Sequence, residues 1–196
     1  MSVLALDTAS RESAVALRTE AGGALLDRRE VPGGDLDVRL GEVIAELLDE
    51  TVHAVVVLTG PGSYSGVRAG MAAALGVAMA RSLPLHGVGN LAAIAGVAGA
   101  ADGERFRAVA DAERGGVYVA AFVSRGGAVE QLSPVQRVEA ATLDRTCRNF
   151  ASAAIAGVET VRLAAVDVLA AAVPLALSRP PLDPAGLSAT HAERPR

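Results

Sequence analysis

The first sixty residues alternate between short apolar runs and turn-forming residues. Three apolar segments, residues 3–6, 13–17 and 24–31, are separated by tight turns, which predicts three antiparallel strands at one side of a sheet. Apolar side chains then recur at helical spacing, at Leu36, Leu40, Val43, Ile44 and Leu47. The β-branched run at residues 54–58 is typical of a strand buried on both faces. This order of strands and helices predicts an α/β layer architecture.

The second half of the chain repeats this order more weakly. A strand at residues 85–88 precedes an apolar helix that Asn90 caps and that runs to about residue 98. Further strands are predicted at 106–110, 117–123 and 128–132, and helices at 139–148 and 159–172.

The repeated order predicts two lobes of unequal size. The larger lobe comprises residues 1–100 and the smaller one residues 101–177. Prolines dominate from Ser178 onward, so residues 178–196 are expected to form a poorly ordered tail.

The helix predicted after residue 63 has an unusual composition. No charged residue occurs between Arg68 and Arg81. Small residues recur every four positions, at Gly66, Gly70, Ala74 and Ala78. Large apolar residues form a neighbouring stripe, at Val67, Met71, Leu75 and Met79. Because a helix that is apolar all round is buried all round, one face is expected on this chain's sheet and the other on a partner protein. Complete burial within the same chain is the alternative.

The turn that precedes this helix, residues 60–66, is rich in glycine and resembles a phosphate cradle. A Walker A loop needs Lys after its last Gly, but Val67 follows Gly66 and the chain contains no Lys. A nucleophile elbow needs Gly on both sides of its Ser, and neither Ser63 nor Ser65 has them. A dinucleotide fingerprint needs its third Gly one place earlier. The pattern therefore favours a structural loop built from Gly60, Pro61, Gly62, Ser63 and Gly66.

Composition and charge exclude several classes of function. The net charge of −4 argues against tight direct binding of nucleic acid. The single cysteine, Cys147, excludes an internal disulfide and fits a reducing compartment. No basic, apolar leader and no membrane-length apolar run occurs, so a cytoplasmic protein with no membrane association is expected.

Candidates for catalysis or metal binding are few. His53, His86 and His191 are isolated in sequence, and none forms a pair with metal-ligand spacing. Asp7, followed by Thr8, ends the first predicted strand. An acid there either holds a hydrated metal near a phosphate or satisfies turn amides. These two residues are weak candidates for cofactor binding, and we predict no catalytic residue, no metal and no cofactor.

Four segments, in this order and spacing, resemble the TsaB (YeaZ) family. They are residues 4–9 (LALDTA), 60–70 (GPGSYSGVRAG), 87–91 (GVGNL) and 111–118 (DAERGGVY). The resemblance implies an actin-like ATPase (ASKHA, ribonuclease H-like) fold with two lobes, the C-terminal one short. It also implies a non-catalytic scaffold subunit for forming N6-threonylcarbamoyladenosine at tRNA position 37.

The resemblance further implies a set of partners. The chain is expected to dimerise with the catalytic paralogue TsaD through the helices on both sides of the glycine-rich loop, to form homodimers when alone, and to contact tRNA only indirectly. The ATPase TsaE joins the complex. The expected interface residues are Val67, Arg68, Met71, Ala74, Leu75, Ala78 and Met79, together with Leu40 and Ile44.

The chain departs from the family pattern at two places. Leu36 stands where many members have His, and residues 184–196 lack the Tyr-Leu-Arg-like ending. The alternatives to a scaffold subunit are a stand-alone ASKHA nucleotide-binding ATPase and a glycoprotease-like peptidase.

Overall fold

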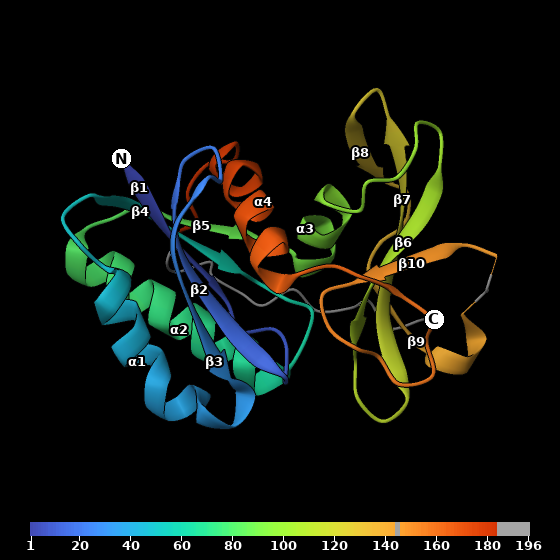
Figure 1. The fold of residues 1–196 in the computed structure, drawn as a ribbon, viewed down its shortest axis with the longest axis horizontal. Helices are drawn as coiled ribbons and strands as arrows, with labels where there is room; N and C mark the ends of the chain where they lie inside the picture. Colours follow the sequence, from blue (N-terminus) through green and yellow to red (C-terminus); the bar gives the residue numbers. More distant parts are fainter. Residues whose placement is uncertain (144–145, 184–196) are drawn as a thin grey trace.

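The computed structural model describes residues 1–143 and 146–183 and contains two β-sheets, each the centre of one lobe (Figure 1). The first sheet has the order β3-β2-β1-β4-β5. Its strands are β1 (Ser2–Asp7), β2 (Ser13–Glu20), β3 (Leu25–Pro32), β4 (Val52–Leu58) and β5 (Leu85–Val88). The meander β1-β2-β3 is antiparallel, as the sequence predicted, whereas β1, β4 and β5 run parallel.

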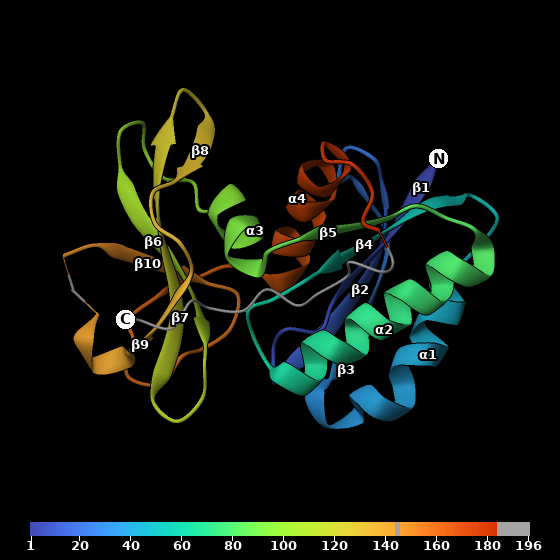
Figure 2. The ribbon, with the colours of Figure 1, turned by 180° about the vertical axis from the view of Figure 1, so that it is seen from behind.

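Both faces of the first sheet are covered because its central strands are apolar on both sides. Leu4 and Leu6 pack with α1 (Leu36–Leu47) and α2 (Tyr64–Arg81), which lie side by side on one face (Figure 2). Val3 and Ala5 face the opposite way, into a core that includes α4 (Ala165–Leu177). The predicted α/β layer architecture is therefore confirmed.

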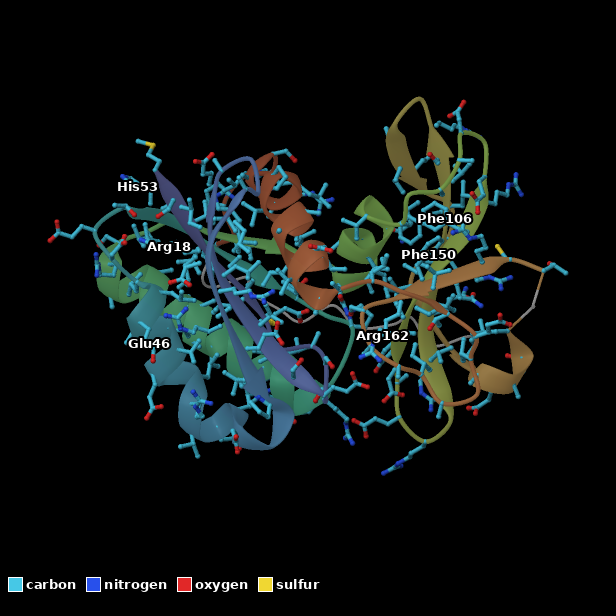
Figure 3. All side chains as sticks on the ribbon, viewed as in Figure 1. Arg18, Glu46, His53, Phe106, Phe150 and Arg162 are labelled. Carbon is cyan, nitrogen blue, oxygen red and sulfur yellow. The ribbon has the colours of Figure 1, made fainter. Side chains whose placement is uncertain are left out.

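The second sheet has the order β11-β10-β6-β7-β8, with β9 also paired to β7. Its strands are β6 (Arg105–Asp111), β7 (Gly116–Arg125), β8 (Ala128–Gln131), β9 (Gln136–Glu139), β10 (Arg148–Ala151) and β11 (Val161–Arg162). Phe106 stacks on Phe122 at 5.9 Å between ring centroids and meets Phe150 edge-on at 5.4 Å. Figure 3 labels Phe106 and Phe150 in this lobe. These three rings form the aromatic centre of this lobe.

Two helices join the lobes. Helix α3 (Asn90–Gly96) packs on the second sheet, α4 packs on the first, and the two helices contact each other. The sequence predicted that residues 101–177 form the second lobe. Helix α4 lies on the first sheet instead, so it is not part of the second lobe.

One predicted helix is wrong and another begins later than predicted. Within 139–148 the described residues include the last residue of β9, a short 3-10 turn, Ala140–Thr142, and the first residue of strand β10. In the region 159–172, β11 comes first and the helix begins only at Ala165. Strand pairing decides both cases, since β10 lies between β6 and β11 and hydrogen-bonds to each.

The segment after α4 is held on the first lobe. The Leu182 N–H donates to the Leu85 carbonyl at 2.7 Å, and the Leu182 side chain lies against Gly87. The predicted disordered tail therefore does not begin at Ser178, and its residues 184–196 lie outside the described residues. Within the described part of the chain, no helix is both long enough and apolar enough to cross a membrane.

Helix α2 packs very closely on the end of β1. A side chain at Gly66 would overlap the Thr8 carbonyl, and one at Gly70 would overlap the Thr8 hydroxyl. The opposite face of α2 is uncovered in this chain, with Ala72, Gly76 and Met79 exposed. The alternative of complete burial of α2 within this chain is therefore wrong, and a partner on the uncovered face stays a prediction.

We predict that Gly70→Ala lowers the free energy of unfolding by about 1–3 kcal/mol, because its methyl group must displace the buried Thr8 side chain. Gly76→Ala on the same helix is the matched control. No atom lies within 4 Å of a Cβ at that position, so the better helix former should raise stability by about 0.5–1 kcal/mol. Urea denaturation measures both, and equal effects of the two substitutions would contradict the close approach.

Candidate functional site

The segments singled out in the sequence meet at the carboxyl ends of the parallel strands β1, β4 and β5. Residue 7 ends β1 and residues 8–9 follow it, residues 59–63 follow β4, and residues 89–90 follow β5. In open α/β sheets, ligands bind at this edge. It is therefore the first place to look for chemistry.

Hydrogen bonds tie the glycine-rich loop to both neighbouring segments. The Ser63 N–H donates to the Ala9 carbonyl at 2.8 Å, and the Asn90 N–H donates to the Gly60 carbonyl at 2.7 Å. The Asn90 side-chain amide donates to the Pro61 carbonyl at 3.2 Å. Asn90 is the first residue of α3 rather than its cap, which is Gly89. The loop therefore joins the first strand to the helix that enters the second lobe.

The glycines of this loop are explained by packing. Gly60 has a φ of +86°, a conformation that residues with side chains rarely adopt. A Cβ at Gly62 would overlap the Ala9 carbonyl. The Ser63 hydroxyl accepts from the Gly66 N–H at 3.4 Å and caps α2. The amides of Ser63 and Gly66 are thus bonded within the protein.

Asp7 and Thr8, the weak cofactor candidates, are turned inward. Both are buried, and neither lines the cleft between the lobes that is described below. The Asp7 carboxylate accepts from the Ala9 N–H at 2.8 Å, and the Thr8 hydroxyl donates to the Gly66 carbonyl at 2.7 Å. Burial raises the pKa of Asp7 to about 6, and the hydrogen bond from Ala9 opposes that rise.

A small polar cleft lies between the lobes beside this junction. Its volume is about 60 Å³, well below the roughly 300–1,000 Å³ of small-molecule sites. Polar residues from both lobes line it, namely Ser10, Arg11, Glu12, Ser63, Asn90, Asp111, Glu113 and Ser152. Among the described residues, no group of three or more His, Cys, Asp or Glu side chains is placed to hold a metal ion.

Sequence reasoning did not single out the charged residues of this cleft. Arg11 and Glu12 lie in the turn between β1 and β2 and carry no recognisable motif. Glu113 is a carboxylate of the matching segment 111–118, to which the sequence assigns no role. Their proximity depends on how the lobes pack, which no local pattern reports.

The predicted interface residues divide into two groups. Six of them belong to this chain's own core: Leu40, Ile44, Val67, Met71, Ala74 and Ala78. They are buried because α1 and α2 present them to the first sheet, so they are not available on the monomer surface. Arg68 and Met79 are exposed, and Leu75 is half-buried.

The exposed face of α2 contains further residues that the sequence did not suggest. Tyr64 is 62% exposed and Met79 67% exposed. Ala72 and Gly76 lie between them on the exposed side, and Val38 on the neighbouring helix α1 is 75% exposed. We refer to Tyr64, Arg68, Ala72, Gly76 and Met79 as the α2 face.

Comparison with known proteins identifies relatives of the same kind that the sequence motifs indicated. A family model described as "TsaD: tRNA N6-adenosine threonylcarbamoyltransferase" matches residues 37–166. The TsaB protein of Bacillus subtilis is 31% identical over 148 residues, covering 70% of this chain and 62% of that protein. The TsaB protein of Escherichia coli is 32% identical over 129 residues, covering 62% and 55%. The chain thus spans about three fifths of the length of these curated relatives.

Two solved structures from Pseudomonas aeruginosa share the fold. One is a protein with similarity to peptidase YeaZ, with a TM-score of 0.74 at 21% identity over 98% of this chain and 99% of that one. The other is YeaZ, with a TM-score of 0.71 at 23% identity over 97% and 99%. These comparisons confirm the resemblance and the two-lobed, actin-like (ASKHA) fold expected from the sequence.

The raised pKa of Asp7 predicts a pH-dependent stability. The unfolded chain has the ordinary pKa of 3.8 at this position, whereas the folded chain holds the proton up to about pH 6. The folded state is therefore favoured below pH 3.8, and this advantage is lost as the pH rises through 6. Asp7→Asn keeps an acceptor for the Ala9 N–H and removes the buried charge. We predict that this variant is more stable than wild type at pH 7.5, by about 3 kcal/mol at most.

The measurement is urea unfolding of both proteins at pH 7.5 and pH 4.5. The difference between them should shrink at the lower pH, where Asp7 is protonated in the folded state. A difference that is the same at both pH values would show that Asp7 is not a buried acid of raised pKa.

Proposed function

This chain belongs to the TsaD family, and we propose that it is a non-catalytic subunit in the formation of N6-threonylcarbamoyladenosine in tRNA, acting by pairing with a TsaD-like catalytic subunit. The two curated relatives are named as tRNA threonylcarbamoyladenosine biosynthesis proteins, and this supports a role of the chain in the same pathway. The uncovered α2 face is the observation that best supports pairing with another subunit. In this proposal the protein works in the cytoplasm, forms a homodimer when alone, and is joined by a TsaE-like ATPase.

The composition of the α2 face supports a protein partner. Apart from Arg68, it presents only uncharged side chains until Arg81 ends the helix. Its small residues, Ala72 and Gly76, allow a helix of another protein to approach closely. The exposed Met79 adds a flexible apolar contact of the kind found at adaptable binding surfaces.

Arg68 and Tyr64 form a preassembled pair at one end of this face. The Arg68 guanidinium donates to the Tyr64 hydroxyl at 2.5 Å and lies 5.2 Å from the centre of its ring. Arginine and tyrosine are enriched among residues that dominate binding energy. Holding the two side chains together before binding also lowers the entropy lost on association.

Two further observations support a subunit without its own chemistry. The inter-lobe cleft, at about 60 Å³, is small for a nucleotide. The polar groups of Asp7 and Thr8 are engaged within the lobe. The net charge of −4 supports an indirect contact with tRNA, through the partner.

We predict that Met79→Glu weakens binding to the TsaD-like partner from the same genome at least 100-fold. The substitution buries an unpaired charge in the contact, at a cost of about 3–5 kcal/mol, and about 1.4 kcal/mol corresponds to tenfold in affinity. Because Met79 is exposed in the monomer, the variant should fold normally. The measurements are size exclusion with light scattering and a binding titration.

Val129→Glu, at an exposed position of β8 in the other lobe, is the matched control and should bind as wild type. A tRNA modification assay with and without this chain then tests the subunit role. Modification that proceeds equally well without it, or ATP turnover by this chain alone, would overturn the proposal.

A further inference from the structure

The turn between β1 and β2 connects the first lobe to the second through two neighbouring residues of opposite charge. The Arg11 guanidinium donates to the Glu113 carboxylate at 2.5 Å. The Arg162 guanidinium donates to the Glu12 carboxylate at 2.6 Å. Arg162 lies on the side of the second lobe that faces the first (Figure 3). Each pair joins segments that are far apart in the sequence and belong to different lobes.

Both sides of these pairs are held in place by their own lobe. In the first lobe, the Gly33 N–H donates to the Glu12 carbonyl at 2.9 Å, and the Ser63 N–H to the Ala9 carbonyl. In the second lobe, the Asp111 carboxylate accepts from the Glu113 N–H at 3.0 Å, and Arg137 donates to the Glu113 carbonyl at 3.2 Å. The side chains of Arg11, Glu12 and Glu113 therefore extend from fixed turns, and that of Arg162 extends from strand β11.

The remaining contact between the lobes is of a different kind. Helix α3 on the second sheet packs against α4 on the first, and residues of both belong to one continuous apolar core. The chain crosses between the lobes at the start of each of these two helices. A rotation of one lobe against the other would therefore be centred on the α3–α4 contact, where both crossings lie.

The ion pairs lie at the cleft, since Arg11, Glu12 and Glu113 all line it. Their side chains are between 40% and 61% exposed. Exposed ion pairs are weak individually and are screened by salt. A contact of this type restrains the lobes reversibly, and its alternating signs select one relative orientation, because Arg11 would be repelled by Arg162.

We propose that Arg11 and Glu12 form an electrostatic clasp that holds the lobes closed over the cleft, and that its release opens them about the α3–α4 contact. The clasp consists of the pairs Arg11–Glu113 and Glu12–Arg162. It is independent of any partner, and it makes the width of the cleft depend on ionic strength.

Pulsed electron–electron double resonance, which measures the distance between two spin labels, tests the clasp directly. The labels are placed at the exposed positions Asp37→Cys in the first lobe and Gln136→Cys in the second, with Cys147→Ser to remove the native thiol. At about 50 mM salt we expect a single narrow distance distribution. At about 1 M salt, where the screening length is about 3 Å, the distribution should broaden and shift to a different mean.

The double variant Arg11→Ala, Glu12→Ala should give the high-salt distribution at both salt concentrations. The matched control Arg125→Ala, Glu130→Ala removes an equally exposed ion pair within the β7–β8 hairpin, and it should behave as wild type. Circular dichroism establishes that each variant is folded.

Charge reversal provides the second test. Arg11→Glu alone should give the open distribution, and combining it with Glu113→Arg should restore the closed one at low salt. Distributions that superimpose for wild type, the double variant and the reversed pair at both salt concentrations would overturn the proposal and leave the α3–α4 contact as the only restraint on the lobes.

Discussion

The close approach of α2 to the end of β1 is the contact on which the arrangement of the first lobe and its junction depends. Thr8 lies in the space that side chains at Gly66 and Gly70 would occupy, and its hydroxyl donates to the Gly66 carbonyl. This contact sets the position of the helix start, and with it the glycine-rich loop that bonds to Ala9 and Asn90. Since Asn90 begins α3, the same contact also determines where the chain enters the second lobe.

That packing has a consequence for chemistry at the carboxyl edge of the sheet. Several polar groups at this edge bind the backbone of neighbouring segments: the Thr8 hydroxyl donates to Gly66, the Asp7 carboxylate accepts from Ala9, and the Asn90 side-chain N–H donates to Pro61. The Asn90 side-chain oxygen is buried without a hydrogen-bond partner. The edge that is a ligand site in other α/β proteins thus also joins the glycine-rich loop to β1 and α3. The fold is therefore compatible with a subunit whose contribution is a surface, and the α2 face begins one residue after Ser63, which belongs to that junction.

Local patterns predicted those elements whose burial follows from local periodicity. The β1–β3 meander, the amphipathic helix α1 and the buried strand β4 all have an unambiguous period. Residues of β10 and β11 were predicted to be helical, but they form strands because β10 pairs with β6 and β11 pairs with β10. The pairing of β10 with β6 joins distant segments, so no local pattern reports it. For α2 the sequence analysis assigned the large apolar stripe to the partner, because apolar residues surround the helix and its periodicity cannot distinguish the two faces. Of that stripe, Val67 and Met71 are buried in this chain, whereas Met79 is exposed. The inter-lobe ion pairs join residues 102 and 150 positions apart, beyond the reach of any motif.

The two kinds of contact between the lobes have different physical consequences. The α3–α4 contact is apolar, so salt does not weaken it, and both chain crossings lie at its ends. In the proposed opening the lobes rotate near these helices, because any other axis would stretch one of the crossings or open the apolar core. The cleft reaches the first residue of α3, Asn90, and the two ion pairs bridge it. Because these pairs are exposed, a rise in ionic strength weakens them while the apolar packing of each lobe is preserved.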